Sequence, residues 1–304
     1  MSANLNIEQG ALVRLTRGIA LVTSALSFPA AAQERQAYAE ALEDFDAVLT
    51  RQPQSVDALI ARGHTHGLIG NRVQADADLQ RALSLAPESP QALVVRGLIR
   101  NRQGDKALAM RDYEAALQGD PSYPQALVNR AALLSEQGRH DEALRNLDRA
   151  IAVAPKNPVA HYNRGFAHFA THDYGRALDD YDTAIRLDPE MGVAYNNRCL
   201  VRAIVGKDLQ AAREDCQTAR LLLPHDPAVN ETRGFLFLKM GDARSALSEY
   251  DRALSGDPNR PLALYGRGIA RALLGNATAG ERDRMAALSL SPLTADQFTR
   301  YGIK

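Results

Sequence analysis

The sequence predicts an all-α fold, an α-solenoid in which pairs of helices joined by short turns repeat along the chain. The first observation is a set of prolines that recur at an almost constant spacing, with one step that is one residue longer: Pro53, Pro87, Pro121, Pro155, Pro189, Pro224, Pro258 and Pro292. The second is an alanine five positions before each later proline: Ala82, Ala116, Ala150, Ala184, Ala219, Ala253 and Ala287. A fixed period of this size is the signature of stacked structural repeats.

The composition excludes several classes of function and of binding site. The chain carries 36 basic and 36 acidic side chains, so no overall positive field would attract nucleic acid or an anionic membrane. Two cysteines exclude a disulfide-dense scaffold and a zinc site built from four cysteines. No nucleotide-binding, nucleophile-elbow or zinc-protease motif occurs, and regular repeats leave no insertion for a catalytic pocket. The sequence therefore predicts no metal and no cofactor, and it disfavours an enzyme.

The N-terminal segment, residues 1–32, has the pattern of an export signal. Arg14 and Arg17 precede an uncharged stretch of about 11 residues, and Pro29 and the alanines at 30–32 follow it. Cleavage after Ala32 would leave Gln33 as the first residue. The apolar stretch is too short to span a bilayer, so we expect no membrane insertion after cleavage. We therefore expect an exported protein, periplasmic in a bacterium; the alternative is a buried first helix of the fold.

The remaining elements follow from the proline period. Residues 33–55 match only the second half of a repeat, and we expect the stretch 36–51 to form an N-terminal capping helix. Residues 295–304 should cap the other end, with Phe298 and Tyr301 lying on the last repeat, because terminal repeats cannot bury both faces. Seven full repeats are predicted between the caps, at 56–89, 90–123, 124–157, 158–191, 192–226, 227–260 and 261–294.

The repeat at 158–191 illustrates the expected local structure. One helix is predicted from Val159 to Ala170, a turn at 171–173, and a second helix from Tyr174 to Leu187. Proline then ends the second helix, because it has no N–H to donate and disfavours helix just before it. Glycine stands in most of the turns, where the end of a helix favours a left-handed residue. The repeat at 192–226 has one extra residue, which we place in its turn.

Motifs within the repeats resemble those of the tetratricopeptide repeat (TPR) family. The likeness is carried by Tyr-Asn-Arg-Gly at 162–165, Asp-Tyr-Asp at 180–182 and Leu-Asp-Pro at 187–189, and it covers about Val56 to Thr294. The resemblance implies a right-handed superhelix whose inner face is lined by the first helix of each repeat. The last four residues, Tyr-Gly-Ile-Lys, resemble the end of exported bacterial members of the family.

The resemblance also bears on the two cysteines, which lie in the irregular repeat. Position 8 in the first helix and position 24 in the second face each other across such a hairpin, and these positions hold Cys199 and Cys216. A disulfide within one repeat is therefore implied, and an oxidising compartment would preserve it. The alternative is a pair of free thiols that serve as small core residues.

Arginine precedes the small position of the first helix in every full repeat, and an acid follows at a nearly constant spacing in all but one. We expect these residues to form a ladder of ion pairs between the two helices of each repeat. The alternative is that unpaired arginines bind phosphate or carboxylate groups. The series are Arg62, Arg96, Arg130, Arg164, Arg198, Arg233 and Arg267, and Asp78, Asp112, Asp180, Asp215, Glu249 and Asp283, with Asn146 as the exception.

Three histidines, His161, His168 and His172, fall on one helical face, which raises the question of a metal site. His161 and His172 would be about 16 Å apart along a helix, too far to share one ion. The resemblance also places His161 and His168 where the family packs aromatic residues. We therefore interpret these two histidines as core residues rather than metal ligands.

The resemblance implies that six positions of each repeat face the groove of the superhelix. One of them supplies asparagine in three successive repeats, and such a series can hold the backbone amides of an extended peptide. Neighbouring positions are mostly apolar, and an exposed apolar strip usually marks a partner site. The alternative is that these side chains pack against one another or against the preceding repeat. The predicted groove residues are Asn129, Tyr162, Asn163, Phe166, Phe169, Asn197, Leu200, Ile204, Phe235, Leu238, Tyr265 and Ile269.

These features predict a non-enzymatic, exported scaffold that binds a protein or an extended peptide, and not nucleic acid. One alternative is a structural subunit of an envelope assembly that binds through its outer face or its ends, and an enzyme is a remote one. Capture of a peptide's C-terminal carboxylate, which some family members perform, is not supported because the groove positions that would need Lys or Arg hold neither. The partner and the oligomeric state are left open.

Overall fold

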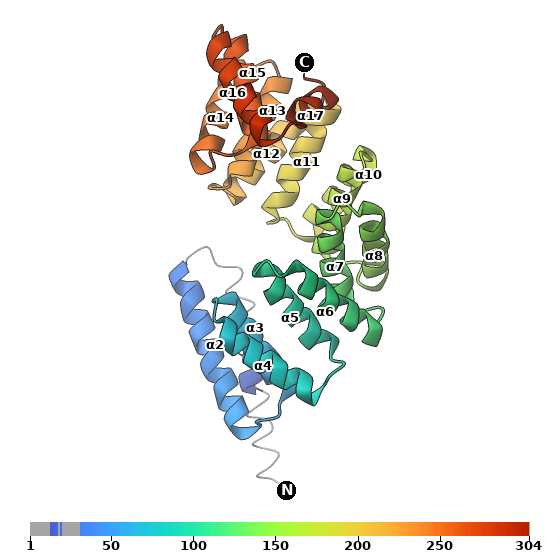
Figure 1. The fold of residues 1–304 in the computed structure, drawn as a ribbon. Helices are drawn as coiled ribbons and strands as arrows, with labels where there is room; N and C mark the ends of the chain where they lie inside the picture. Colours follow the sequence, from blue (N-terminus) through green and yellow to red (C-terminus); the bar gives the residue numbers. More distant parts are fainter. Residues whose placement is uncertain (1–12, 18, 20–30, 304) are drawn as a thin grey trace. The chain divides into compact units, whose positions relative to one another are not determined.

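The computed structural model describes residues 13–17, 19 and 31–303. Most of the predicted signal peptide, residues 1–12, 18 and 20–30, lies outside the described residues. The chain divides into two compact units, residues 1–137 and 138–304, which we call the N-terminal body and the C-terminal body and describe separately. The described secondary structure is entirely helical, and helix follows helix in tandem (Figure 1). The prediction of an all-α solenoid of helix pairs is confirmed.

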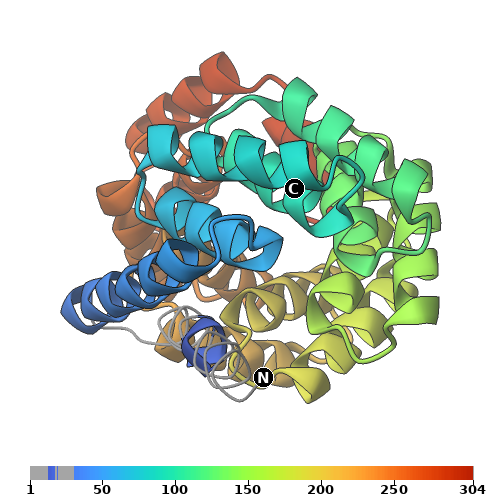
Figure 2. The same ribbon diagram turned by 90° about the horizontal axis from the view of Figure 1, so that it is seen from below.

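In the N-terminal body, one long helix is followed by two helix pairs and the first helix of a third. Figure 2 shows the long helix running alongside those that follow it. Ala41 and Phe45 of this helix are fully buried and pack with Ala61 and Leu68 of the next one, so it covers the open side of the first pair. The helices are α2 (Ala31–Arg51), α3 (Val56–Leu68), α4 (Arg72–Leu85), α5 (Pro90–Arg102), α6 (Lys106–Gly119) and α7 (Pro124–Glu136).

Residues 13–17 are helical and lie against α2. Leu15 packs beside Ala41 and Phe45, and Arg14 and Arg17 approach the carboxylate of Asp44 to 3.5 and 3.3 Å. Asp44 is buried and occupies the register of the ladder acids, one repeat before Asp78. These two arginines therefore neutralise a buried acid that has no first-helix arginine of its own.

The C-terminal body holds a single second helix, four helix pairs and a short last helix. Its largest core cluster runs from Cys199 and Cys216 to Phe298 and Tyr301. Among the helices that the structure describes, none is both long and apolar enough to cross a bilayer. The helices are α8 (His140–Val153), α9 (Pro158–Ala170), α10 (Tyr174–Leu187), α11 (Gly192–Val205), α12 (Leu209–Leu222), α13 (Pro227–Lys239), α14 (Ala243–Gly256), α15 (Pro261–Leu273), α16 (Ala277–Leu290) and α17 (Thr294–Arg300).

Small residues allow the two helices of a pair to approach closely. A methyl group added at Gly165 would lie 2.9 Å from the ring of Tyr181, and one added at Gly234 would lie 2.8 Å from the ring of Tyr250. Both tyrosines are fully buried, so neither ring has room to withdraw. The tyrosine of one helix therefore fits only because the facing helix carries glycine.

The extra residue of the repeat at 192–226 lies in the turn, as we expected. Gly206 has a left-handed φ of 73° and follows its counterpart in the preceding turn, His172, at the regular spacing of 34 residues. The second helix α12, however, begins 35 residues after α10. The insertion therefore falls between Gly206 and Leu209, after the end of the first helix.

Candidate functional site

The structure pairs the first-helix arginines with the acids of the same repeat in every case but one. The acids are buried, and a buried carboxylate is costly unless a cation and hydrogen bonds compensate it. Arg130 is the exception, since its Nε is buried without a hydrogen-bond partner among the described residues. The N–O distances are 2.6 Å for Arg62–Asp78, 2.7 Å for Arg96–Asp112, 2.8 Å for Arg164–Asp180, 2.5 Å for Arg198–Asp215, 3.2 Å for Arg233–Glu249 and 2.8 Å for Arg267–Asp283.

Additional charges surround the ladder. In three repeats a second arginine, one helical turn after the first, contacts the same acid at 2.7 to 2.8 Å; these are Arg100, Arg202 and Arg271. This second series was not predicted, although it recurs four residues after the first and could have been found from the period. The hydrogen bond to Asp78 raises the pKa of Arg62, and a smaller contribution from Asp46 raises it further. Together they outweigh the partial burial of the guanidinium, which lowers the pKa. Paired in this way, these arginines serve the helix contacts rather than an external phosphate.

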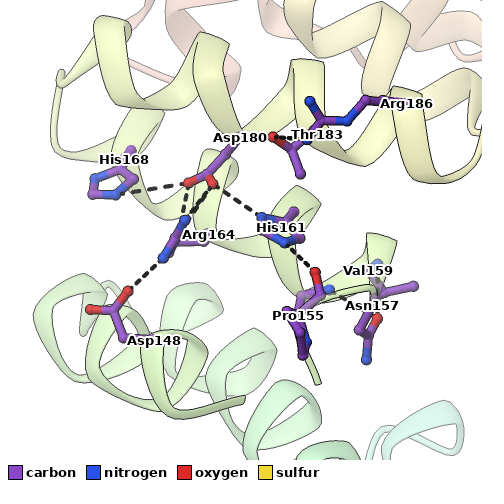
Figure 3. A network of polar contacts seen from close by, with 11 residues as sticks. Asp148, Pro155, Asn157, Val159, His161, Arg164, His168, Asp180, Thr183 and Arg186 are labelled. Atoms are coloured by element: carbon purple, nitrogen blue, oxygen red, sulfur yellow. Dashed lines mark hydrogen bonds and ion pairs between the residues drawn. The ribbon is translucent and has the colours of Figure 1, made fainter. Parts of the chain in front are cut away.

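The repeat at 158–191 replaces the second arginine by a histidine (Figure 3). Asp180 accepts hydrogen bonds from Arg164, and His168 stands one turn later with its Nε2 3.9 Å from the carboxylate. His161 approaches the same carboxylate from the other side, with its Nδ1 at 3.4 Å. Arg164 also reaches Asp148 of α8 at 2.8 Å. Both histidines are buried, and within the described part of the chain no cluster of ligating side chains suits a metal ion.

His161 has an acceptor on each ring nitrogen. Its Nε2 lies 3.0 Å from the backbone carbonyl of Pro155, while its Nδ1 faces Asp180. A neutral imidazole can donate from only one nitrogen, whereas the doubly protonated ring donates from both. Either neutral tautomer therefore satisfies one of the two acceptors, and only the imidazolium would satisfy both.

A disulfide joins Cys199 of α11 to Cys216 of α12. The Cα atoms are 5.4 Å apart, and the cysteines are separated by 17 positions in the sequence. Both residues are fully buried in the main core cluster of the C-terminal body. The bond therefore links the two helices of the irregular repeat covalently.

The predicted groove residues lie on the first helices, but their exposure varies. Asn129 is on α7 of the N-terminal body, and the others lie on α9, α11, α13 and α15 of the C-terminal body. Phe166 is 39% exposed. By contrast, Phe235, Leu238 and Ile269 are 5%, 9% and 8% exposed, so they cannot meet a partner while they are covered. The remaining residues are half-buried: Asn129, Tyr162, Asn163, Phe169, Asn197, Leu200, Ile204 and Tyr265.

Only some of the asparagines are available to a peptide. The Nδ2 of Asn197 donates to the hydroxyl of Tyr162 at 3.1 Å, across from α11 to α9. The side-chain amide of Asn163, in contrast, forms no hydrogen bond with any described residue. One amide of the predicted series is thus engaged within the protein, and another keeps its full hydrogen-bonding capacity.

The C-terminal segment, residues 294–303, covers part of this side of the C-terminal body. The ring of Phe298 lies 5.1 Å from that of Tyr265 and 6.1 Å from that of Phe235, between centroids. Tyr301 lies 5.7 Å from Phe235, and its backbone carbonyl accepts a hydrogen bond from Lys239 at 2.9 Å. We expected both aromatic residues to lie on the last repeat. The structure instead lays the segment back across α13 as well as α15, where Phe235 and Tyr265 pack against its aromatic rings.

The segment reaches still further along the first helices. Arg300 donates to Nε2 of His172 at 3.2 Å, and His172 lies in the turn between α9 and α10. A cavity of about 190 Å³ remains beside the segment, lined by Phe169, Leu200, Phe235, Phe298 and Tyr301 among others. We call the face of α9, α11, α13 and α15 on which this segment and the cavity lie the first-helix surface. It is an apolar surface that already holds an aromatic segment.

Comparison with protein families identifies the repeats. Models described as tetratricopeptide repeat match residues 69–124 and 232–287, 158–191, and 112–145, and a TPR repeat model matches 133–172. Together these matches cover more than half of the chain. None of the curated protein sequences compared matches this one significantly.

Solved structures show the same fold. A chain from the crystal structure of the APC/C hetero-tetramer Cut9-Hcn1 aligns with a TM-score of 0.71 at 16% identity, over 87% of this chain and 52% of that one, so this chain spans about half its length. A tetratricopeptide repeat protein from Parabacteroides merdae aligns with a TM-score of 0.60 at 21% identity, over 82% and 99% of the two chains. The human IFIT1 dimer with PPP-AAAA gives 0.57 at 17% identity, over 85% and 72%. With the family matches and the tandem helix pairs, this likeness establishes that the chain belongs to the tetratricopeptide repeat family.

Proposed function

We propose that this protein is a non-enzymatic scaffold that binds a segment of a partner protein in the concave groove, on the first-helix surface of the C-terminal body. The TPR fold is consistent with a role in protein–protein interaction. The observation that supports the site is the seating of the protein's own C-terminal segment. Phe298 and Tyr301, three residues apart along the segment, are only 3% and 8% exposed there. A partner with aromatic side chains at the same spacing would find the same contacts.

The part of this surface that the C-terminal segment leaves open continues along α9 and α11. Val159, Phe166 and Val193 are 45%, 39% and 39% exposed, and Asn163 lies among them with its amide unpaired. Val159 and Phe166 are seven residues apart and therefore share one helix face. A partner segment would bury these apolar side chains and would receive backbone hydrogen bonds from Asn163.

The C-terminal segment and a partner would compete for the aromatic part of the surface. A partner that uses Phe235 and Tyr265 must displace Phe298 first, so its apparent affinity falls with the fraction of molecules in which the segment is docked. A partner confined to α9 and α11 would bind without this competition. A partner that uses Phe235 and Tyr265 would therefore bind only if its own contacts outweigh those of the C-terminal segment.

We also propose that the protein acts in the cell envelope. The sequence pattern of residues 1–32 favours export, and a disulfide between Cys199 and Cys216 is the kind of bond that persists in an oxidising compartment. Secretion of a fusion of residues 1–32 to a reporter, followed by N-terminal sequencing, tests this. A processed reporter whose N-terminus directly follows Ala32 is expected, and an unprocessed cytoplasmic reporter would contradict the proposal.

The binding proposal is tested by crosslinking capture from the envelope fraction with the chain from Gln33 as bait. A second bait carries Asn163→Ala, Asn197→Ala and Phe166→Ala, and a matched control carries Met285→Ala, an apolar residue that is 64% exposed on the second helix α16. We expect the partner to be lost with the triple variant and kept with the control. A partner kept equally by all three baits would place the contact on the outer face or the ends and would favour a structural role in an assembly.

A further inference from the structure

A separate cavity of about 510 Å³ lies between α12 and α13 of the C-terminal body. Three arginines, Arg213, Arg220 and Arg233, line it together with Gln217. Apolar side chains complete the wall, among them Leu221, which is 76% exposed, and Phe237, whose ring lies 5.8 Å from the guanidinium of Arg233. The cavity shares the helix α13 with the first-helix surface, but different residues line the two sites.

Four of the other ion pairs of the ladder show which residue can occupy the position beside the arginine. Four first-helix arginines also contact an aspartate on the second helix of the preceding repeat, two residues after its ladder position. The pairs are Arg62–Asp46 at 2.6 Å, Arg164–Asp148 at 2.8 Å, Arg198–Asp182 at 2.6 Å and Arg267–Asp251 at 3.1 Å.

At Arg233 this carboxylate is missing. The residue two positions after Asp215 is Gln217, which carries no charge, and the Nε of Arg233 is buried without a hydrogen-bond partner among the described residues. A buried guanidinium N–H without an acceptor is costly, because the group has lost its water and received nothing in exchange. The cavity beside Gln217 is the space from which an acceptor could reach it.

The side chains around the cavity also carry an excess of positive charge. Arg213 and Arg220 stand four residues before and three residues after Gln217, on the same face of α12. Arg213 forms no ion pair with any described residue. Arg220 and Arg233 share the carboxylate of Glu249, at 3.7 and 3.2 Å, and Arg252 also contacts it at 3.0 Å. One carboxylate therefore serves three guanidinium groups, and a fourth has none.

We propose that this cavity binds an aspartate or glutamate side chain of a partner segment, with an apolar residue beside it. The carboxylate would take the place that Asp46, Asp148, Asp182 and Asp251 occupy on the other rungs, within reach of Arg233, Arg213 and Arg220. The apolar neighbour would cover Leu221 and Phe237. The site does not depend on the first-helix surface, so a partner could use it alone or together with that surface.

The probe is the capped peptide N-acetyl-Leu-Asp-Leu-amide, titrated into the full chain labelled with ¹⁵N-arginine. We expect a saturable shift of the Nε–H signal of Arg233, and none with the matched peptide N-acetyl-Leu-Asn-Leu-amide. Replacement of Arg213 and Arg220 by glutamine should weaken binding by about tenfold or more, because two charge-assisted contacts are lost. Inorganic phosphate is the second arm of the experiment. A response to phosphate without a response to the aspartate peptide, or no response to either, would overturn the proposal.

A substitution that supplies the missing carboxylate gives the sharpest test. Gln217→Asp should pair with Arg233, leave the melting temperature unchanged or raise it, and abolish the response to the peptide. The matched control is Gln80→Asp, at the same register of the repeat at 56–89, where Asp76 and Leu83 stand in place of Arg213 and Arg220. We expect this control to bind the peptide as the unmodified chain does. Full peptide binding by a folded Gln217→Asp variant would refute the assignment.

Discussion

Replacing Phe298 by alanine should release α17 from the first-helix surface while the repeats stay folded. Phe298 is 3% exposed, and its ring packs against those of Tyr265 and Phe235. The other anchors of the C-terminal segment are Tyr301 and the hydrogen bond from Lys239 to its carbonyl. Because α17 is the last described helix of the chain, its release leaves the helix pairs before it intact.

The magnitude follows from the buried ring. Burial of a phenylalanine side chain contributes about 1.5–3 kcal/mol, and each favourable aromatic pair adds about 0.5–1.5 kcal/mol. Part of this is recovered because the neighbouring side chains relax into the space. A net loss of about 2 kcal/mol would raise the opening equilibrium of α17 roughly 30-fold.

Amide hydrogen exchange measures this opening directly. The N–H groups of Tyr301, Gly302 and Ile303 donate to carbonyls within the segment, so their exchange reports whether it is docked. In Phe298→Ala we expect protection at these amides to fall roughly 30-fold, with no change in α10. Thr299→Ala, at an exposed position of the same helix, is the matched control and should leave protection within a factor of about two.

Unchanged protection in Phe298→Ala would refute the reasoning, since it would mean that the ring does not hold the segment in place. A fall in protection throughout the C-terminal body would refute it differently, because α17 would then be part of the cooperative core. The competition proposed for partner binding depends on the first result, namely release of the segment alone.

Three further outcomes are expected. Replacing Cys199 and Cys216 by alanine should lower the free energy of unfolding by about 3 kcal/mol, because the bond closes a short loop in the unfolded chain, and urea unfolding checks this. In the same assay Asp215→Asn, which removes the buried carboxylate shared by Arg198 and Arg202, should cost about 3–5 kcal/mol. Asp182→Asn, which removes an exposed carboxylate, should cost less than about 1 kcal/mol. Burial, with Arg102 nearby, lowers the pKa of His64. Protonation therefore favours the unfolded state, and stability should fall as the pH drops through about 6.5, a slope that His64→Gln should reduce in unfolding measured from pH 8 to 5.

Contacts inside one repeat follow closely from the order of residues. The two helices of a pair are joined by a few residues, so a fixed period determines which positions face each other. That register is why Arg164 can be matched with Asp180, and Cys199 with Cys216, from the sequence. The same register explains Gly165, which faces the ring of Tyr181.

Features that do not follow the repeat period were harder to predict from the sequence. The missing second carboxylate at Arg233 could have been found in the sequence, by comparing Gln217 with Asp182 and Asp251. Its cavity could not, because empty space depends on how α12 and α13 pack.

The sequence by itself determined the repeats, the helix pairs and the residues that line their first helices. It did not determine which of those lining residues remain open to a partner. Phe235 is covered because the C-terminal segment, which belongs to no repeat, folds back and buries Phe298 and Tyr301 against it. The physical reason is that a periodic pattern specifies contacts between neighbours, whereas burial of an apolar surface depends on every segment that can reach it.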